Sequence, residues 1–223
     1  MATLKDVTKT CLQLLLDEPF FGHYLAGVPK EISEKTDAAG IGLMSRQMVK
    51  LLVNGEAWDR LDEPHRYGLI KHEVLHLVFG HLISQRQYAH KILFHIAADV
   101  VVNQYIQKEQ SDAESITFER LEYLEKEQGI EWKRGMDAGY YYRQLLKVQQ
   151  SPKAGKSALS NRDLDLSELL KGNHPDLKKH QFWSEFQSLS PAEAKLIENQ
   201  IENNFRQSMR RIRGQKQPDF DYL

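Results

Sequence analysis

Hydrophobic residues recur along most of the chain at the three- and four-residue spacing of α-helices. This spacing predicts an amphipathic helix over residues 3–16 and a largely apolar helix from about residue 65 to residue 83. Asp62-Glu63-Pro64 predicts the start of the second helix, with Pro64 in its first turn. Residues 90–107 are apolar on nearly every side of a helix, which predicts that this helix is buried. Further helices are predicted for residues 137–148 and, after a capping box that begins at Ser190, for about five or six turns.

Two short runs have the character of β-strands. They are Ile41–Met44 and Met48–Val53, and Asn54-Gly55 closes the second. Residues 149–165 are polar and predict a solvated linker or loop. We therefore expect a predominantly helical α+β main domain over residues 1–150, followed over residues 151–223 by a polar linker and a C-terminal helical extension.

Composition and charge narrow the class of protein. The 223 residues include 30 Lys+Arg and 31 Asp+Glu, a net charge of −1, so no overall field attracts nucleic acid. The single cysteine, Cys11, excludes a disulfide framework and a cysteine-rich zinc site. The N-terminal apolar run is too short for a signal peptide or a membrane span. We therefore expect a cytoplasmic protein whose partners do not include a membrane.

Residues 71–82, KHEVLHLVFGHL, contain the His-Glu-x-x-His pattern of zinc peptidases. On a helix, His72 and His76 lie about 40° apart around the axis, so both imidazoles can bind one zinc ion. Glu73 then lies beside the metal, where a carboxylate can take a proton from water and pass it to the leaving amine. The pattern predicts a zinc-dependent peptidase with Glu73 as general base.

His81 is the third histidine of this segment. If the helix continues to residue 83, His81 lies about 180° around the axis from His72 and cannot face the same metal. Metzincins break the helix at a glycine and place the third ligand ten residues after the first, whereas Gly80 comes one residue late and His81 one residue early. We therefore expect His81 to be partly exposed or to hydrogen-bond to a ligand, and not to bind the metal.

The buried helix over residues 90–107 offers a better third ligand. His95, Asp99 and Asn103 recur every four residues and form one polar stripe. A buried carboxylate needs a cation or several donors, and a zinc ion on the neighbouring helix would supply the cation. We predict that Asp99 is the third ligand. His95 is the alternative ligand, and His95 or Asn103 can instead hydrogen-bond to the ligands.

Four segments carry a resemblance to a known family: PFFGHYL, GLIKHEVLHLVFGHL, HIAADVVVNQYI and AGYYYRQLL. Over about residues 10–150 the chain resembles the bacterial metallopeptidase domain that usually precedes a von Willebrand A-like domain. The resemblance implies a zincin-like fold, with His72, His76 and Asp99 as ligands and Glu73 as base, and association with an AAA ATPase. The family usually has asparagine where this chain has His95. No room for the A-like domain remains before residue 223, which suggests a fragment or a stand-alone form.

The sequence therefore leaves two zinc-dependent functions open, beside a third in which the chain is a metal-free helical interaction domain. The first is a zinc peptidase acting on a peptide or protein. Met48–Val53 is then either an edge strand that pairs with substrate or an ordinary sheet strand. At most one of Tyr140–Tyr142 can donate to the oxyanion, and core packing is favoured for these tyrosines. The second is a non-catalytic, zinc-stabilised scaffold that works with a partner ATPase or A-like domain. His174 and His180 lie in a polar region and receive no role.

Overall fold

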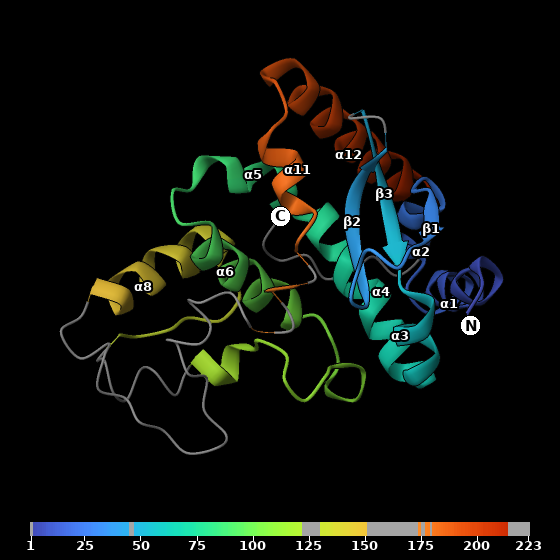
Figure 1. The fold of residues 1–223 in the computed structure, drawn as a ribbon, viewed down its shortest axis with the longest axis horizontal. Helices are drawn as coiled ribbons and strands as arrows, with labels where there is room; N and C mark the ends of the chain where they lie inside the picture. The colour runs from blue at the N-terminus through green and yellow to red at the C-terminus, as the bar shows by residue number, and fades with distance from the viewer. Residues whose placement is uncertain are drawn as a thin grey trace.

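A computed structural model describes residues 2–44, 47–121, 130–150, 174, 177–178 and 180–213 (Figure 1). The α-helices are α1 (Leu4–Asp17), α2 (Pro19–Ala26), α3 (Gly55–Arg60), α4 (Glu63–Val78), α5 (His81–Ser84), α6 (Lys91–Asn103), α8 (Ala138–Gln150), α11 (Trp183–Gln187) and α12 (Pro191–Arg211). Two 3-10 turns, η1 (Gln85–Gln87) and η2 (Lys108–Gln110), and three strands, β1 (Lys30–Ile32), β2 (Ala39–Met44) and β3 (Met48–Val53), complete the described part. The predicted predominantly helical α+β fold is confirmed.

The starts of the long helices follow from local capping. The Asp62 carboxylate accepts the N–H of His65 at 3.0 Å, and Pro64 stands in the first turn of α4, where its missing N–H has no helical partner to lose. At α12, the Ser190 hydroxyl accepts the N–H of Glu193, whose carboxylate accepts the N–H of Ser190. Both helices were predicted from these same residues.

The three strands form a mixed sheet in the order β1-β3-β2. β3 is therefore the central strand, parallel to β1 and antiparallel to β2. Of the two interpretations of Met48–Val53, the edge strand is wrong and the ordinary sheet strand holds, because β1 pairs with the side of β3 that faces away from β2. β1 has only three residues, too few to show a strand pattern in the sequence. In the described part of the chain, β2 is the edge strand that contacts α4 and α11.

Helix α4 lies at the centre of the fold (Figure 1). Every residue from Tyr67 to Val78 is buried, and α1, α2, β2, α6 and α12 pack around it. Helix α6 is almost as fully buried and packs against α8. The two helices that carry the polar residues of interest are thus core helices. The C-terminal helix α12 packs on α2, α4 and β3, and the division of the chain at residue 150 stays a prediction.

The predicted extent of the central helix needs correction. It ends at Val78 and does not continue to residue 83, because Gly80 adopts the left-handed conformation with φ 66°. A glycine in this conformation is the common way to end a helix, since a side chain there would be strained. The short helix α5 then begins at His81 in a new direction, so the angle derived for a continuous helix does not apply to His81.

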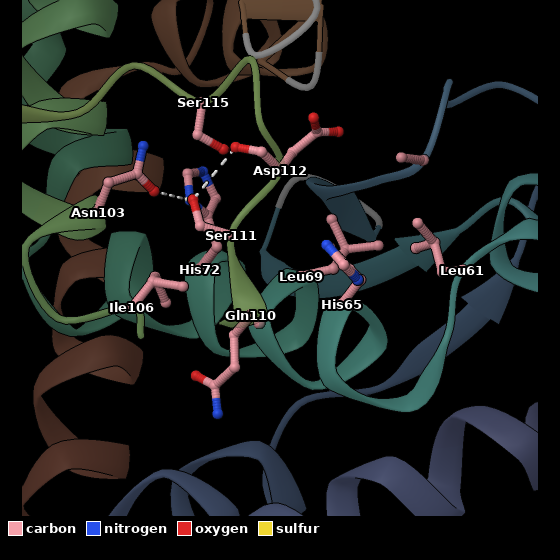
Figure 2. Close-up of a pocket in the computed structure, with 12 residues that line it drawn as sticks. Leu61, His65, Leu69, His72, Asn103, Ile106, Gln110, Ser111, Asp112 and Ser115 are labelled. Carbon is pink, nitrogen blue, oxygen red and sulfur yellow. Dashed lines mark hydrogen bonds between the residues drawn. The ribbon is translucent and has the colours of Figure 1, made fainter. Parts of the chain in front are cut away.

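A small pocket of about 70 Å³ opens beside α4. It is lined by residues from α4, the end of α6 and the turn after η2, with apolar groups such as Leu61 and Leu69 and polar groups such as Asp112. Figure 2 shows the ring of His72 in this pocket next to the amide of Asn103. The pocket therefore reaches the first histidine of the His-Glu-x-x-His pattern.

Candidate metal centre

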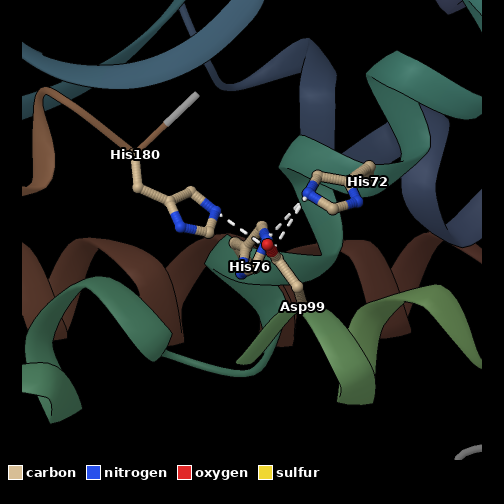
Figure 3. Close-up of side chains that lie close together, drawn as sticks. All are labelled: His72, His76, Asp99 and His180. Carbon is tan, nitrogen blue, oxygen red and sulfur yellow. Dashed lines mark hydrogen bonds and ion pairs between the residues drawn. The ribbon is translucent and has the colours of Figure 1, made fainter. Parts of the chain in front are cut away.

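Four buried side chains from three parts of the chain converge at one point (Figure 3). His72 and His76 come from α4, Asp99 comes from α6, and His180 lies just before α11. One ligand atom from each lies within 4.8 Å of the others, and none of the four side chains is more than 5% exposed. The predicted trio is brought together, and a fourth residue joins it.

The spacing of these atoms is that of a compact coordination shell. The Nε2 atoms of His72 and His76 are 3.0 Å apart. Oδ1 of Asp99 lies 3.5 Å from Nε2 of His72, 3.2 Å from Nε2 of His76 and 3.1 Å from Nε2 of His180. A tetrahedral zinc site with bonds of about 2.0–2.1 Å separates its ligand atoms by about 3.3 Å. The four recorded distances cluster around this value.

Asn103 orients His72. Its Nδ2 donates to the carbonyl of Ile116 at 2.8 Å, which identifies the other amide atom, 3.0 Å from Nδ1 of His72, as the oxygen. Nδ1 of His72 must therefore carry the hydrogen. The neutral ring then has its lone pair on Nε2, which is the atom that faces the cluster.

His81 stands behind His76. Their Nδ1 atoms are 3.0 Å apart, and His81 is only 4% exposed. When Nδ1 of His76 donates this hydrogen bond, the lone pair of His76 lies on Nε2 and faces the cluster. The expectation of partial exposure is wrong, because the helix break at Gly80 turns His81 inward. Its place behind a cluster histidine agrees with the alternative that it hydrogen-bonds to a ligand.

Burial and mutual attraction set the charges of the cluster. Burial lowers the pKa of His76 well below its usual value, so this ring is neutral at neutral pH. Burial opposes the charged form of Asp99, but the rings of His180, His72 and His76 outweigh it and hold the pKa of Asp99 well below the usual range. Asp99 is therefore a carboxylate among imidazoles.

The buried polar atoms of the cluster fit a metal ion. Within the described residues, neither oxygen of Asp99 and neither ring nitrogen of His180 forms a hydrogen bond of standard geometry. Such atoms are rare in a protein interior unless an ion or water binds them. A cation would balance the negative charge of Asp99, and Glu73 adds a second acidic side chain at 0% exposure. Imidazole and carboxylate donors suit zinc.

His95 takes part in a different contact. Gln85 donates from Nε2 to the carbonyls of Leu82 and Trp183, so its Oε1 accepts from Nε2 of His95 at 3.2 Å. Burial lowers the pKa of His95 to about 3, which keeps this ring neutral. The structure therefore places His95 beside the His180–Trp183 segment and outside the group of four.

The sequence interpretation missed His180, which it left without a role in a polar region. The structure buries this ring to 2% exposure and stacks it on Trp183, with centroids 4.0 Å apart. A signal was present: Leu177, Trp183 and Phe186 surround it at roughly helical spacing, and all three are buried. Only the tertiary structure shows that this segment meets α4 and α6.

The three consecutive tyrosines are engaged elsewhere. Tyr140 and Tyr141 donate to the carbonyls of Glu131 and Lys133, and the Tyr142 hydroxyl accepts the N–H of His90. Tyr141 and Tyr142 are also buried in the core. The structure therefore gives these residues a packing role.

Fold and site together define a predominantly helical α+β domain with a buried His/Asp cluster that can hold a metal ion. Residues 3–212 match the family described as "Putative metallopeptidase domain", and the chain belongs to this family. No curated protein and no solved structure matches the chain significantly. Among the described residues, no helix combines the length and the apolar character needed to cross a membrane.

Proposed function

We propose that the protein is a zinc-dependent peptidase of zincin-like architecture, with His72, His76 and Asp99 as metal ligands and Glu73 as general base. The observation that carries the proposal is the meeting of the two α4 histidines with a buried carboxylate from α6, at distances suited to one zinc ion. Membership in a family described as metallopeptidases supports the same reaction class.

Three side chains beside the proposed ligands would take part in this chemistry. When bound, zinc would supply a positive charge that makes water more acidic and polarises a peptide carbonyl. Asn103 and His81 hold the two α4 rings with Nε2 toward the cluster. Glu73, buried on the same helix, would accept the proton of the attacking water and return it to the leaving amine.

The surroundings of the cluster support a peptide or protein as substrate. The pocket of about 70 Å³ reaches His72 and combines apolar and polar groups, which suits a small side chain of a peptide. The edge strand β2 contacts α4 and offers backbone groups for pairing with an extended peptide. A cytoplasmic location is part of the proposal and rests on the single cysteine.

One observation favours a second function, a non-catalytic metal-stabilised module. His180 raises the number of buried candidate ligands to four, and four protein ligands are typical of structural zinc sites, whereas catalytic sites keep one position open. Such a module would act as a scaffold for a partner, for which an AAA ATPase or a von Willebrand A-like domain is proposed from the family resemblance.

Metal analysis and one variant test the proposal. Protein purified without chelator is expected to contain about one zinc per chain, and Glu73→Gln is expected to keep the zinc and to lose cleavage of a peptide library. Protein without zinc, whose melting a chelator leaves unchanged, would refute both functions. Cleavage that persists in Glu73→Gln would refute the assigned base.

A further inference from the structure

The segment His180–Gln187, here called the covering segment, contacts two features of the site at once. At its start, Nε2 of His180 lies 3.1 Å from Oδ1 of Asp99 in the cluster. Five residues later, the Glu185 carboxylate accepts the backbone N–H of Leu43 on β2 at 2.9 Å. The same segment thus places a fourth candidate ligand in the cluster and binds a backbone N–H group of the neighbouring strand.

The contact with Leu43 falls on the outer edge of the sheet. β2 pairs with β3 along Ala39–Met44, and α11 lies against β2. An edge strand has unpaired N–H and C=O groups that can pair with an extended peptide. Here a side-chain carboxylate takes one of these N–H groups, so the covering segment stands where an extended peptide would bind beside the cluster.

The four cluster residues differ in how firmly the fold holds them. His72, His76 and Asp99 belong to α4 and α6, two long helices that are buried in the core. His180 precedes α11, a helix of only five residues, which side-chain contacts hold in place. Gln85 donates to the carbonyl of Trp183 at 2.9 Å, and Gln181 donates to the carbonyl of Lys35. His180 is therefore the one residue of the cluster that a short segment, and not a long core helix, supplies.

We propose that the covering segment is an inhibitory element built into the chain, in which His180 fills the fourth ligand position and Glu185 blocks the edge of β2. With a metal ion bound, displacing the segment would remove His180 from the fourth ligand position, which one water molecule would then take, and the edge of β2 would become available to an extended peptide. The inference rests on the proposed peptidase function, and it accounts for four protein ligands in a domain of a metallopeptidase family.

Cobalt(II) in place of zinc makes ligand exchange visible in the absorption spectrum, whether or not a peptide is cut. Full-length wild-type protein, His180→Ala and Glu185→Ala are each loaded with cobalt and titrated with imidazole, a small copy of the His180 side chain. His174→Ala is the matched control, because it removes a histidine of the same region that lies outside the cluster. Cobalt content is measured for every sample.

Imidazole is expected to restore the wild-type spectrum of His180→Ala at a concentration at least about tenfold below any that changes wild type or His174→Ala. Glu185→Ala keeps His180 but loses the anchor on β2, so its imidazole midpoint is expected to fall several-fold below that of wild type. Equal titration of wild type and both variants would overturn the inference. If His180→Ala fails to fold, an unchanged midpoint in Glu185→Ala overturns it.

Cleavage assays on the same samples separate the inference from the proposed function. An opened site that binds imidazole in His180→Ala or Glu185→Ala and also cuts peptides supports both. Ligand exchange without cleavage by wild type or either variant supports the displaceable ligand but refutes the peptidase. Cleavage by wild type that neither substitution increases, with unchanged imidazole titration, overturns the inhibitory element and leaves the peptidase standing.

Discussion

Replacing Asn103 with alanine removes the acceptor that orients His72, while the proposed metal ligands His72, His76 and Asp99 stay unchanged. The amide oxygen lies 3.0 Å from Nδ1 of His72 in a buried position and determines which ring nitrogen carries the hydrogen. Without it, the neutral ring can place its hydrogen on Nε2, the atom that must bind the metal. Asn103→Ala is therefore expected to weaken zinc binding.

The size of the effect follows from what is lost. Removing a hydrogen-bond partner from a ligating histidine lowers metal affinity by about 10- to 100-fold, which corresponds to about 1.4 to 2.8 kcal/mol. A buried N–H that loses its partner costs about 1–3 kcal/mol, a range that agrees with the first. Asn103→Asp keeps an acceptor for His72 but turns its second oxygen toward the Ile116 carbonyl, so it is expected to bind zinc more tightly than Asn103→Ala and to be less stable than wild type.

Competition with a chromophoric zinc chelator measures the Kd of each variant. Gln104→Ala is the matched control, since it deletes an amide one residue further along, where the side chain bonds to the Val100 carbonyl and the Tyr141 hydroxyl. Urea unfolding of the metal-free variants separates any loss of stability, including that from the lost bond to the Ile116 carbonyl. A zinc Kd of Asn103→Ala within about twofold of both wild type and Gln104→Ala would refute the orienting role.

The remaining predictions concern stability and metal removal. Gly80→Ala is expected to lower the free energy of unfolding by about 1–2 kcal/mol in urea, because φ at residue 80 is 66°. No atom lies within contact distance of the added methyl group, so the effect would come from the backbone alone, and an unchanged unfolding midpoint would contradict it. In metal-free protein, His95 has a pKa of about 3 folded against 6.5 ordinarily, so the unfolded chain binds the proton first and stability falls as pH drops between these values. His95→Gln should reduce this slope by up to about 1.4 kcal/mol per pH unit, and an equal slope in both proteins would exclude this ring as a cause. Chelator is expected to lower the unfolding free energy by about 4 kcal/mol relative to protein with free zinc near a thousand times Kd, as measured by urea titration. Asp99→Asn, which removes the charged ligand and leaves three histidines, should show a smaller difference at the same zinc concentration, and an equal difference would contradict Asp99 as a ligand.

The features that the sequence predicted correctly are mostly local. The start of α4 at Asp62 and of α12 at Ser190 depends on side chains within three residues of the cap, so the order of residues was enough to predict both helices. Helical spacing likewise placed His72 beside His76 and put Asp99 on the polar stripe of a buried helix. The need of a buried carboxylate for a cation then linked the two helices before any contact between them was known.

Tertiary structure decided what depends on residues far apart in the chain. Gly80 could be read as a helix end only once its backbone conformation was known, and that conformation places His81 behind His76. The three-residue strand β1 exists because β3 lies beside it, so the sequence could not reveal that Met48–Val53 is central. His180 joins the cluster across a separation of 81 residues from Asp99, since packing of Trp183 and Phe186 brings its segment onto α4, α6 and β2. Helix caps and helical periodicity depend on residues close together in the chain. His180, in contrast, reaches the cluster only when distant segments bury their apolar side chains together.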